Sequence, residues 1–484
     1  MRADSGSRVD RGAPRSAPTG IRHGLTATVD LVIAGGTVVT GSSRSRCDVG
    51  VEAGRIAALG HQLSGDRVID AQGMLVLPGG VDAHVHFTPA SAAYSWVDDF
   101  ATGSRAAAVG GITTVGNMTS ARDDETLLTA MARVRREAET QSVVDFILHP
   151  VIRPPRASDV ADIAALAAAG HGSLKLFMTD PAFDVHVAAC MEAMQAAAAH
   201  GMTVLVHCED QAVLAHRAAA LIGSGRCDVR AYADSRPDYA EASAVARAAS
   251  MARAAGARLY IVHLSSRAAL SEARRARQRG QDILVETRPE YLYFTRDRLE
   301  APTGALYVGA PPLREPADVE ALWSGLSGGA IQTLGSDHAP WLRAHKLDPS
   351  QNVATLRQGL GVVDVMLPVL FSRGVTTSRL SLERFVALTA TNPARVFGLY
   401  PAKGTIAVGS DADLTIWDPD AEWTLSDSGR ETRADYNVYA GWSLRGRPRT
   451  TIVRGEVVVD RGEVVSPHPR GRFLPAAGGD GTVV

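Results

Sequence analysis

The feature that most constrains the fold is a repeated alternation between residues 78 and 399 of short apolar runs and helix-forming stretches. Eight apolar runs end in polar or turn residues, and they finish near His86, Asn117, His149, Lys175, His207, His263, Thr287 and Asp337. A strand followed by a helix, repeated eight times, is typical of a parallel barrel. The pattern therefore predicts an α/β fold with a (β/α)8, TIM-like barrel.

The stretches between these runs are rich in alanine and in charged residues that favour helices. They include Ala101–Val109, Leu127–Glu139, Val187–His200, Ala240–Ala255 and Ala268–Arg279. The connections after His207 and after Thr287 are longer than the others. We expect these two connections to place extra loops over one face of the barrel.

The two ends of the chain share a different pattern, in which short alternating strands are separated by glycine turns. We expect residues 28–77 and 400–465 to form one small, β-sandwich-like domain, with the barrel, residues 78–399, inserted between them. Residues 1–27 are rich in Arg, Ser, Gly and Pro and are interpreted as a disordered leader. Residues 466–484 remain as a C-terminal tail.

Composition and charge exclude several classes of function. The formal net charge of the 484 residues is -2, which gives no reason to expect nucleic acid or an anionic membrane as a partner. No apolar run reaches the roughly 18 residues that cross a bilayer. The four cysteines are widely spaced and include no CxxC pair, which indicates neither a disulfide framework nor a cysteine zinc site. We therefore expect a cytoplasmic protein.

Polar side chains gather where the predicted strands end, and in such a barrel the reactive groups lie at the C-terminal ends of the strands. His84 and His86 are two residues apart, so both imidazoles point to the same side of one strand. Further candidate ligands at strand ends are Lys175, His207, His263 and Asp337. Imidazole and carboxylate donors suit one or two divalent ions.

Lys175 is the unusual member of this set, because an ammonium group repels a metal ion. One interpretation is a lysine paired with Asp180 or another acid. The other is a carbamate formed with carbon dioxide, whose two oxygens could bridge two ions. The residues alone do not choose between these interpretations.

Taken together, these segments resemble the amidohydrolase superfamily and, within it, the cyclic amidohydrolases: hydantoinases, dihydropyrimidinases and allantoinases. The resemblance covers nearly the whole chain after the leader. It is carried by the Lys175 segment and by Gly79–His86, Val206–Glu209, Ile261–Ser266, Gly335–Pro340, Lys403–Asp413 and Asp435–Gly441.

The resemblance implies a centre of two divalent ions, with zinc favoured. One ion would take His84, His86 and Asp337, and the other His207 and His263. Carboxylated Lys175 and a hydroxide would bridge the two ions. The hydroxide would then attack and open a cyclic amide or imide, namely a dihydropyrimidine, a 5-substituted hydantoin or allantoin. Asp337 would serve as general base and then as general acid.

The pocket departs from the family pattern at four positions, all expected to contact substrate. Asp180 replaces a tyrosine, Ala310 a serine, Gln358 an asparagine and Arg288 a common cysteine. Arg288 and Asp180 could line a new polar pocket or pair with each other. Thr88 stands where a dihydroorotase has an arginine, which argues against that activity.

Two alternatives remain beside the ring-opening hydrolase. One is an amidohydrolase that acts on the C–N bond of another, non-peptide amide, which the altered pocket favours. The other is a non-catalytic scaffold like the collapsin-response-mediator relatives of dihydropyrimidinase, which lose metal ligands, whereas all six candidates are present here. The segment from about residue 430 resembles the part through which hydantoinases form tetramers or dimers, so we expect a homo-oligomer.

Overall fold

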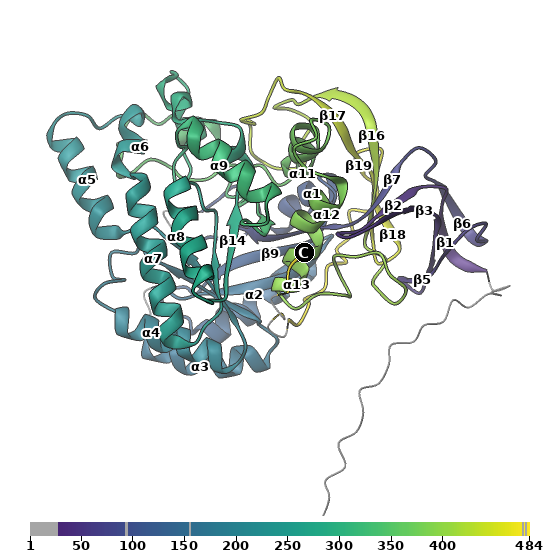
Figure 1. The fold of residues 1–484 in the computed structure, drawn as a ribbon, viewed down its shortest axis with the longest axis horizontal. Helices are drawn as coiled ribbons and strands as arrows, with labels where there is room; N and C mark the ends of the chain where they lie inside the picture. Colours follow the sequence, from purple (N-terminus) through teal and green to yellow (C-terminus); the bar gives the residue numbers. More distant parts are fainter. Residues whose placement is uncertain (1–27, 92–94, 154–155, 477–478, 480–481) are drawn as a thin grey trace, which may run out of the picture.

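The structure is a computed structural model that describes residues 28–91, 95–153, 156–476, 479 and 482–484 (Figure 1). The predicted leader, residues 1–27, lies outside these described residues.

A parallel eight-stranded barrel forms the larger part of the molecule, as the alternating pattern predicted. Its strands are β8 (Gly80–Val85), β9 (Ile112–Ser120), β10 (Asp145–Val151), β11 (Ser173–Phe177), β12 (Thr203–His207), β13 (Leu259–Ile261), β14 (Ile283–Thr287) and β15 (Thr333–Leu334). They lie side by side in chain order from β8 to β15. Among the described residues, one bridge connects Val85, at the end of β8, with His338, which follows β15, so the barrel is nearly closed.

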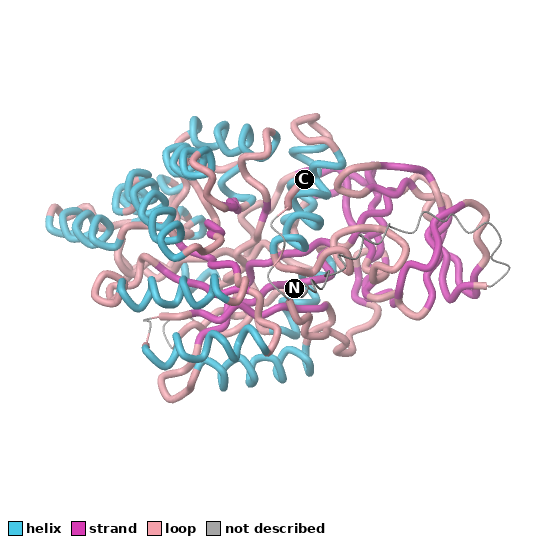
Figure 2. The backbone as a smooth tube through the Cα atoms, turned by 60° about the horizontal axis from the view of Figure 1, so that its bottom comes forward, coloured by secondary structure: helices cyan, strands magenta, loops and turns pink. Residues whose placement is uncertain are grey.

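Helices cover the outside of the barrel, and Figure 2 shows them as a layer around the strands. They are α1 (Phe100–Val109), α2 (Leu127–Gln141), α3 (Ala157–Ala168), α4 (Val187–Ala199), α7 (Asp238–Ala255), α8 (Arg267–Gln278) and α9 (Pro316–Ser327). Two more helices, α5 (Gln211–Gly223) and α6 (Tyr232–Ser235), lie in the long connection after β12 and contribute residues to a cavity at the C-terminal end of the barrel. Helix α1 begins at Asp99, whose side chain accepts a hydrogen bond from the Thr102 backbone amide at 3.0 Å. The five helices named from alanine-rich stretches are confirmed; α3, α5, α6 and α9 were not named individually.

Short helical segments complete the connections between these elements. They are α10 (Arg343–Lys346), α11 (Met366–Leu370), α12 (Leu382–Val386), α13 (Asn392–Val396), the 3-10 turns η1 (Val229–Ala231), η2 (Pro289–Leu292), η3 (Arg296–Glu300) and η4 (Gly304–Tyr307), and the π-helical turns η5 (Phe371–Val375) and η6 (Ala387–Thr391). In the part of the chain that is described, no helix combines the length and apolar character needed to cross a bilayer.

A second, all-β region lies beside the barrel and is built from both ends of the chain (Figure 1). Its strands are β1 (Val29–Ala34), β2 (Thr37–Val39), β3 (Arg44–Arg46), β4 (Asp48–Glu52), β5 (Arg55–Gly60), β6 (Gly65–Asp70), β7 (Leu75–Pro78), β16 (Leu414–Thr424), β17 (Ser443–Val453), β18 (Glu456–Asp460) and β19 (Glu463–Val464). Four form one sheet, in the order β5-β4-β1-β6, and seven form another, in the order β19-β18-β17-β16-β7-β2-β3. The ends of the chain join where Leu77 pairs with Thr415.

A buried ion cluster joins this β region to the barrel. The Lys403 ammonium lies 2.6 Å from carboxylate oxygens of both Asp145, at the start of β10, and Asp413, and 3.1 Å from Asp411. Because Lys403 is buried, its charge needs such partners. Charged side chains thus fix the barrel against the region that the chain ends build.

Candidate metal centre

His84, His86 and Asp337 come together at the C-terminal end of the barrel. His84 lies in β8, His86 follows it, and Asp337 follows β15 on the adjacent side of the barrel. The Asp337 Oδ1 atom is 3.1 Å from His84 Nε2 and 2.9 Å from His86 Nε2. One donor atom from each residue lies within 4.8 Å of the others, and all three residues are buried, so this cluster could hold a metal ion.

A second carboxylate makes this cluster strongly cation-binding. Glu286, in β14, has its Oε1 atom 2.7 Å from His84 Nδ1. Burial alone would lower the pKa of His84, but the charges of Glu286 and Asp337 raise that pKa to about 9. The surroundings therefore stabilise positive charge on this imidazole, whether it is a proton or a metal ion. Glu286 was not predicted as a site residue, because a single acid in an apolar strand carries no distinctive signal.

His207 and His263 form a second group next to the first. His207 ends β12, and its ring centroid lies 4.5 Å from that of His263, which is in turn 5.5 Å from that of His84. Burial lowers the pKa of both His207 and His263, which keeps the imidazoles neutral, as a metal ligand must be. His207 Nε2 bonds a Glu209 oxygen at 2.7 Å, whereas His263 Nδ1 has no hydrogen-bond partner among the described residues.

Two of the candidate ligands adopt an unusual backbone conformation. His263 has a φ of 37° and Asp337 a φ of 44°, in the left-handed region that residues other than glycine rarely occupy. Such strain costs on the order of 1–3 kcal/mol per residue and concentrates at functional sites. The fold therefore maintains a costly geometry at two of the positions where ligands were predicted.

Lys175, in β11, is completely buried, and its Nζ atom has no hydrogen-bond partner in the described part of the chain. The Nζ atom lies over the Phe177 ring, 4.8 Å from the ring centroid. Burial lowers the pKa of this amine to about 8. The interpretation that Lys175 pairs with Asp180 or another acid is wrong, because Asp180 pairs with Arg153 and the Lys175 amine has no ion-pair partner among the described residues. An unpartnered amine with a lowered pKa fits the carbamate interpretation.

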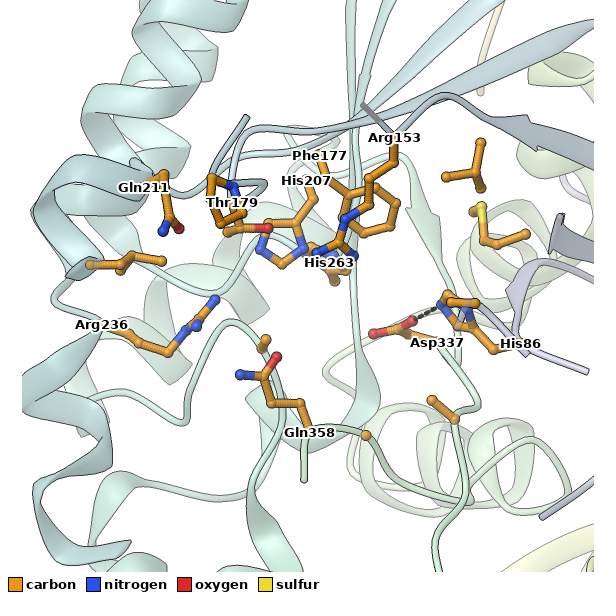
Figure 3. Close-up of a pocket in the computed structure, with 18 of the residues that line it drawn as sticks. His86, Arg153, Phe177, Thr179, His207, Gln211, Arg236, His263, Asp337 and Gln358 are labelled. Atoms are coloured by element: carbon orange, nitrogen blue, oxygen red, sulfur yellow. Dashed lines mark hydrogen bonds and ion pairs between the residues drawn. The ribbon is translucent and has the colours of Figure 1, made fainter. Parts of the chain in front are cut away.

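A cavity of about 370 Å³ opens over these groups, and its lining includes all four histidines and Asp337 (Figure 3). The two long connections contribute to its walls, as predicted, with Gln211 and Arg236 after β12 and Ala310 after β14. Ala310 and Gln358, two of the four positions expected to contact substrate, line the cavity.

The other two of these positions, Asp180 and Arg288, were predicted incorrectly. Asp180 and Arg288 are absent from the lining of this cavity, and they do not pair with each other. Asp180 Oδ2 accepts a hydrogen bond from Arg153 Nε at 2.5 Å. Arg288 lies in the core, donating from Nη1 to Asp337 Oδ2 at 2.8 Å and pairing with Glu290. The reason is distance along the sheet, because β11 and β14 are separated by two strands.

Other histidines near the site, and one cysteine, have structural roles. His149 donates from Nε2 to the Ala83 carbonyl at 2.9 Å and accepts from the Ser173 hydroxyl at Nδ1, 2.5 Å away. His338 bonds Asp98 at 2.9 Å through Nε2, and its Nδ1 accepts from two backbone amides. Cys208, directly after β12, is buried. These groups support the ligands rather than joining them.

Fold and site together define a class of protein. A nearly closed parallel barrel carries imidazoles from three strands and a carboxylate around one cavity at its C-terminal end. A buried amine without a hydrogen-bond partner among the described residues lies on β11 of the same barrel. This combination is that of barrel hydrolases that use divalent metal ions.

Comparison with known proteins identifies the family: the chain belongs to the amidohydrolase family, whose model matches residues 75–458. D-hydantoinase from Ralstonia pickettii is 36% identical over 451 residues, covering 92% of this chain and 98% of that protein. The crystal structure of dihydropyrimidinase from Brevibacillus agri is 33% identical with a TM-score of 0.89, covering 92% of this chain and 98% of that chain. L-Hydantoinase from Arthrobacter aurescens is 32% identical with a TM-score of 0.86, covering 93% and 100%. The resemblance to the cyclic amidohydrolases is thereby confirmed.

Proposed function

We propose that this protein is a metal-dependent hydrolase that opens a cyclic amide or imide ring, namely a dihydropyrimidine, a 5-substituted hydantoin or allantoin. The observation that carries the proposal is the buried, unpartnered amine of Lys175, whose charge acts on the imidazoles of both ligand groups. A buried amine without a partner is costly, which favours its conversion to an anionic ligand. Relatives named as hydantoinases and dihydropyrimidinases support the ring-opening reaction.

The residues present fit two divalent ions, and zinc is favoured because the donors are imidazole nitrogens and carboxylate oxygens. His84, His86 and Asp337 would hold one ion, His207 and His263 the other, and a carboxylated Lys175 would be shared by both. When bound, the ions would polarise the amide carbonyl and lower the pKa of water.

Asp337 is the residue proposed to move protons. Burial would raise its pKa, but the charges of His84 and Arg288 hold that pKa well below its usual range, so the carboxylate stays ionised. It would accept a proton from the attacking water and return it to the leaving nitrogen. Gln358, which lines the same cavity, offers both a donor and an acceptor to the amide edge of a ring.

The remaining assignments concern the whole molecule. We assign residues 28–77 and 400–465 to the small β domain, 78–399 to the catalytic barrel and 466–484 to a tail. Four free cysteines suit a reducing cytoplasm. We also propose a homo-oligomer, a tetramer or dimer, which sedimentation of the purified protein would test.

The decisive experiment is hydrolysis of a substrate panel by protein loaded with zinc, manganese or cobalt. The panel contains dihydrouracil, 5-substituted hydantoins, allantoin and dihydroorotate, and metal content is measured on the same samples. We expect about two ions per chain and turnover of at least one ring. About two ions without turnover of any ring would favour the other amidohydrolase reaction, on a different C–N bond. Protein without bound metal would favour a scaffold.

A further inference from the structure

Arg153 places a guanidinium group in the wall of the cavity. It lies two residues beyond the end of β10 and lines the cavity (Figure 3). Its Nε atom donates to Asp180 Oδ2 at 2.5 Å, and its Cζ atom lies 5.4 Å from the centroid of the Phe177 ring. The other Asp180 oxygen accepts from the Ala182 backbone amide at 2.8 Å, which fixes the carboxylate. The side chain of Arg153 is therefore held on two sides.

This arrangement leaves the recognition face of the guanidinium available. The two terminal nitrogens of Arg153 make no hydrogen bond to any residue that the structure describes. Its side chain is 41% exposed although its partner is largely covered. A guanidinium offers five N–H donors in a planar fork that matches a carboxylate. Only one of them is used here, so the fork can still bind an anion from the cavity.

The second arginine in the lining is already occupied. Arg236 donates from Nε to Glu209 Oε1 at 3.1 Å and pairs with the other oxygen of the same carboxylate. The single acid in the lining is Asp337, which belongs to the metal centre. Among the described residues that line the cavity, Arg153 is therefore the one arginine with free terminal donors, and its acidic partner Asp180 takes up Nε alone.

The position of Arg153 relative to the histidines indicates which part of a substrate it would meet. Within the described part of the chain, Arg153 forms no hydrogen bond or ion pair with His84, His86, His207 or His263. The Phe177 ring contacts Arg153 on one hand and lies 5.7 Å, between centroids, from the ring of His207 on the other. The guanidinium is thus suited to a substituent rather than to the amide being cleaved. A volume of about 370 Å³ leaves space for one beside a small ring.

We propose that Arg153 is a specificity-determining residue that selects cyclic amides bearing a carboxylate, and that Asp180 is its positioning residue. This inference rests on the proposed ring-opening function and adds the substrate class. It also explains the loss of the family tyrosine at 180, since an aspartate there aims a fixed cation at the substituent. Charge-assisted, bidentate pairing supplies the selectivity.

The test compares substrates that differ in the carboxylate. Dihydroorotate and dihydrouracil are one pair, and hydantoin-5-acetic acid and its acetamide are the other; the two pairs separate a ring-bound carboxylate from one on a substituent. We expect kcat/KM of the metal-loaded enzyme to favour the acid in at least one pair. Arg153→Gln should remove about tenfold or more of that preference, mostly through KM, while changing the neutral member less than about threefold.

A matched control variant is Arg247→Gln. Arg247 pairs with Asp184 at 2.6 Å and lies 5.2 Å over the Phe183 ring with 38% exposure, so it repeats the geometry of Arg153 outside the lining of the cavity. We expect it to leave the acid preference unchanged. Arg153→Lys and Asp180→Asn should each lose part of the preference. Both variants keep a cation at position 153, but the first lacks the planar fork and the second lacks the carboxylate that orients it.

Binding of ring-opened products, followed by calorimetry, separates this inference from the proposed function. We expect N-carbamoylaspartate to bind more tightly than N-carbamoyl-β-alanine, with the difference lost in Arg153→Gln. If neither pair is hydrolysed, this binding result alone decides the role of Arg153, and the ring-opening function fails only if every other ring of the panel is left intact as well. Equal kcat/KM for acid and neutral substrates, or a preference that survives Arg153→Gln, would overturn the role of Arg153.

Discussion

The two groups of candidate ligands, His84, His86 and Asp337 on one side and His207 and His263 on the other, differ in how far the protein alone favours a cation at each. His84, His86 and Asp337 already meet through contacts of 2.9 and 3.1 Å, and Glu286 adds a second negative charge. His207 and His263 face each other as neutral imidazoles, and the Glu209 carboxylate beside them is engaged by Arg236.

The first group therefore has the negative charge that stabilises a cation, and the second group lacks it. A neutral pair of imidazoles with an amine nearby is a poor cation site until an anionic ligand is supplied. Carboxylation of Lys175 would supply such a ligand. The contrast predicts that the two groups respond differently to the same perturbations.

The largest expected effect is that of Lys175→Met. This variant would remove the ligand proposed to be shared by both ions, so we expect the metal content to fall from two ions to one per chain, retained by the first group. Activity should fall on the order of 10³-fold or more, because polarisation by the ions is worth several kcal/mol. Elemental analysis and kcat measure the two effects. Wild-type protein reconstituted without bicarbonate should resemble the variant, and two tightly bound ions in Lys175→Met would contradict the contrast.

Asp337→Asn affects the first group instead. The amide cannot accept a proton, so we expect kcat to fall about 10²–10⁴-fold while KM changes little. The unfolding transition should remain cooperative, since the side chain keeps its shape. Near-normal turnover in this variant would remove Asp337 from proton transfer.

Arg288→Met tests how much the ion pairs of Arg288 with Asp337 and Glu290 stabilise the fold. The substitution leaves the buried Glu290 and Asp337 without their cation, and breaking such a pair costs about 3 kcal/mol of stability. Burial raises the pKa of Glu290 to about 7, so the loss should shrink below pH 7, where Glu290 takes up a proton. Chemical denaturation of Arg288→Met and of its double variant with Glu290→Gln measures this. A double variant no more stable than the single one would exclude this explanation.

The smallest effect concerns His149, which bridges the strands of His84 and Lys175 beneath both groups. Burial holds its pKa at about 3, against 6.5 in the unfolded chain. The unfolded state therefore binds more protons between these values, and stability falls as the pH falls below 6.5. For this group alone the loss at pH 5 is about 2 kcal/mol. His149→Gln should show a shallower decline in denaturation free energy between pH 7 and pH 5. An unchanged slope would show that His149 is accessible to protons in the folded state.

The strands and the ligand positions could be predicted because both follow from local patterns. Apolar runs that end in His86, Lys175 or His207 mark strand ends, and strand ends meet at one face of a barrel. Partners of long side chains could not be predicted in the same way. The expected pair of Arg288 with Asp180 spans two intervening strands, whereas the observed partners come from adjacent strands or the same turn.

The sequence also could not predict the backbone conformation of the candidate ligands or the approach of a further acid to them. Nothing in the letters around His263 or Asp337 marks a positive φ, because it is enforced by surroundings distant in the chain. Glu286 is one acid among many until folding places it 2.7 Å from His84. The sequence thus indicates which groups reach the site, and the structure is needed to show how their charges combine.

The barrel seam between β8 and β15 has a consequence for how the molecule responds to chelation. Among the described residues no ladder joins β8 to β15; this side of the barrel is closed by the bridge between Val85 and His338, which follows β15, and by hydrogen bonds such as Ser336 N to Asp82 Oδ1 at 3.1 Å. His84 and His86 stand on one side of this seam and Asp337 on the other. An ion held by all three residues would link β8 to the segment after β15, where few backbone hydrogen bonds join the barrel. Stripping it should speed amide hydrogen exchange along β8 and around His338 before the rest of the barrel loosens.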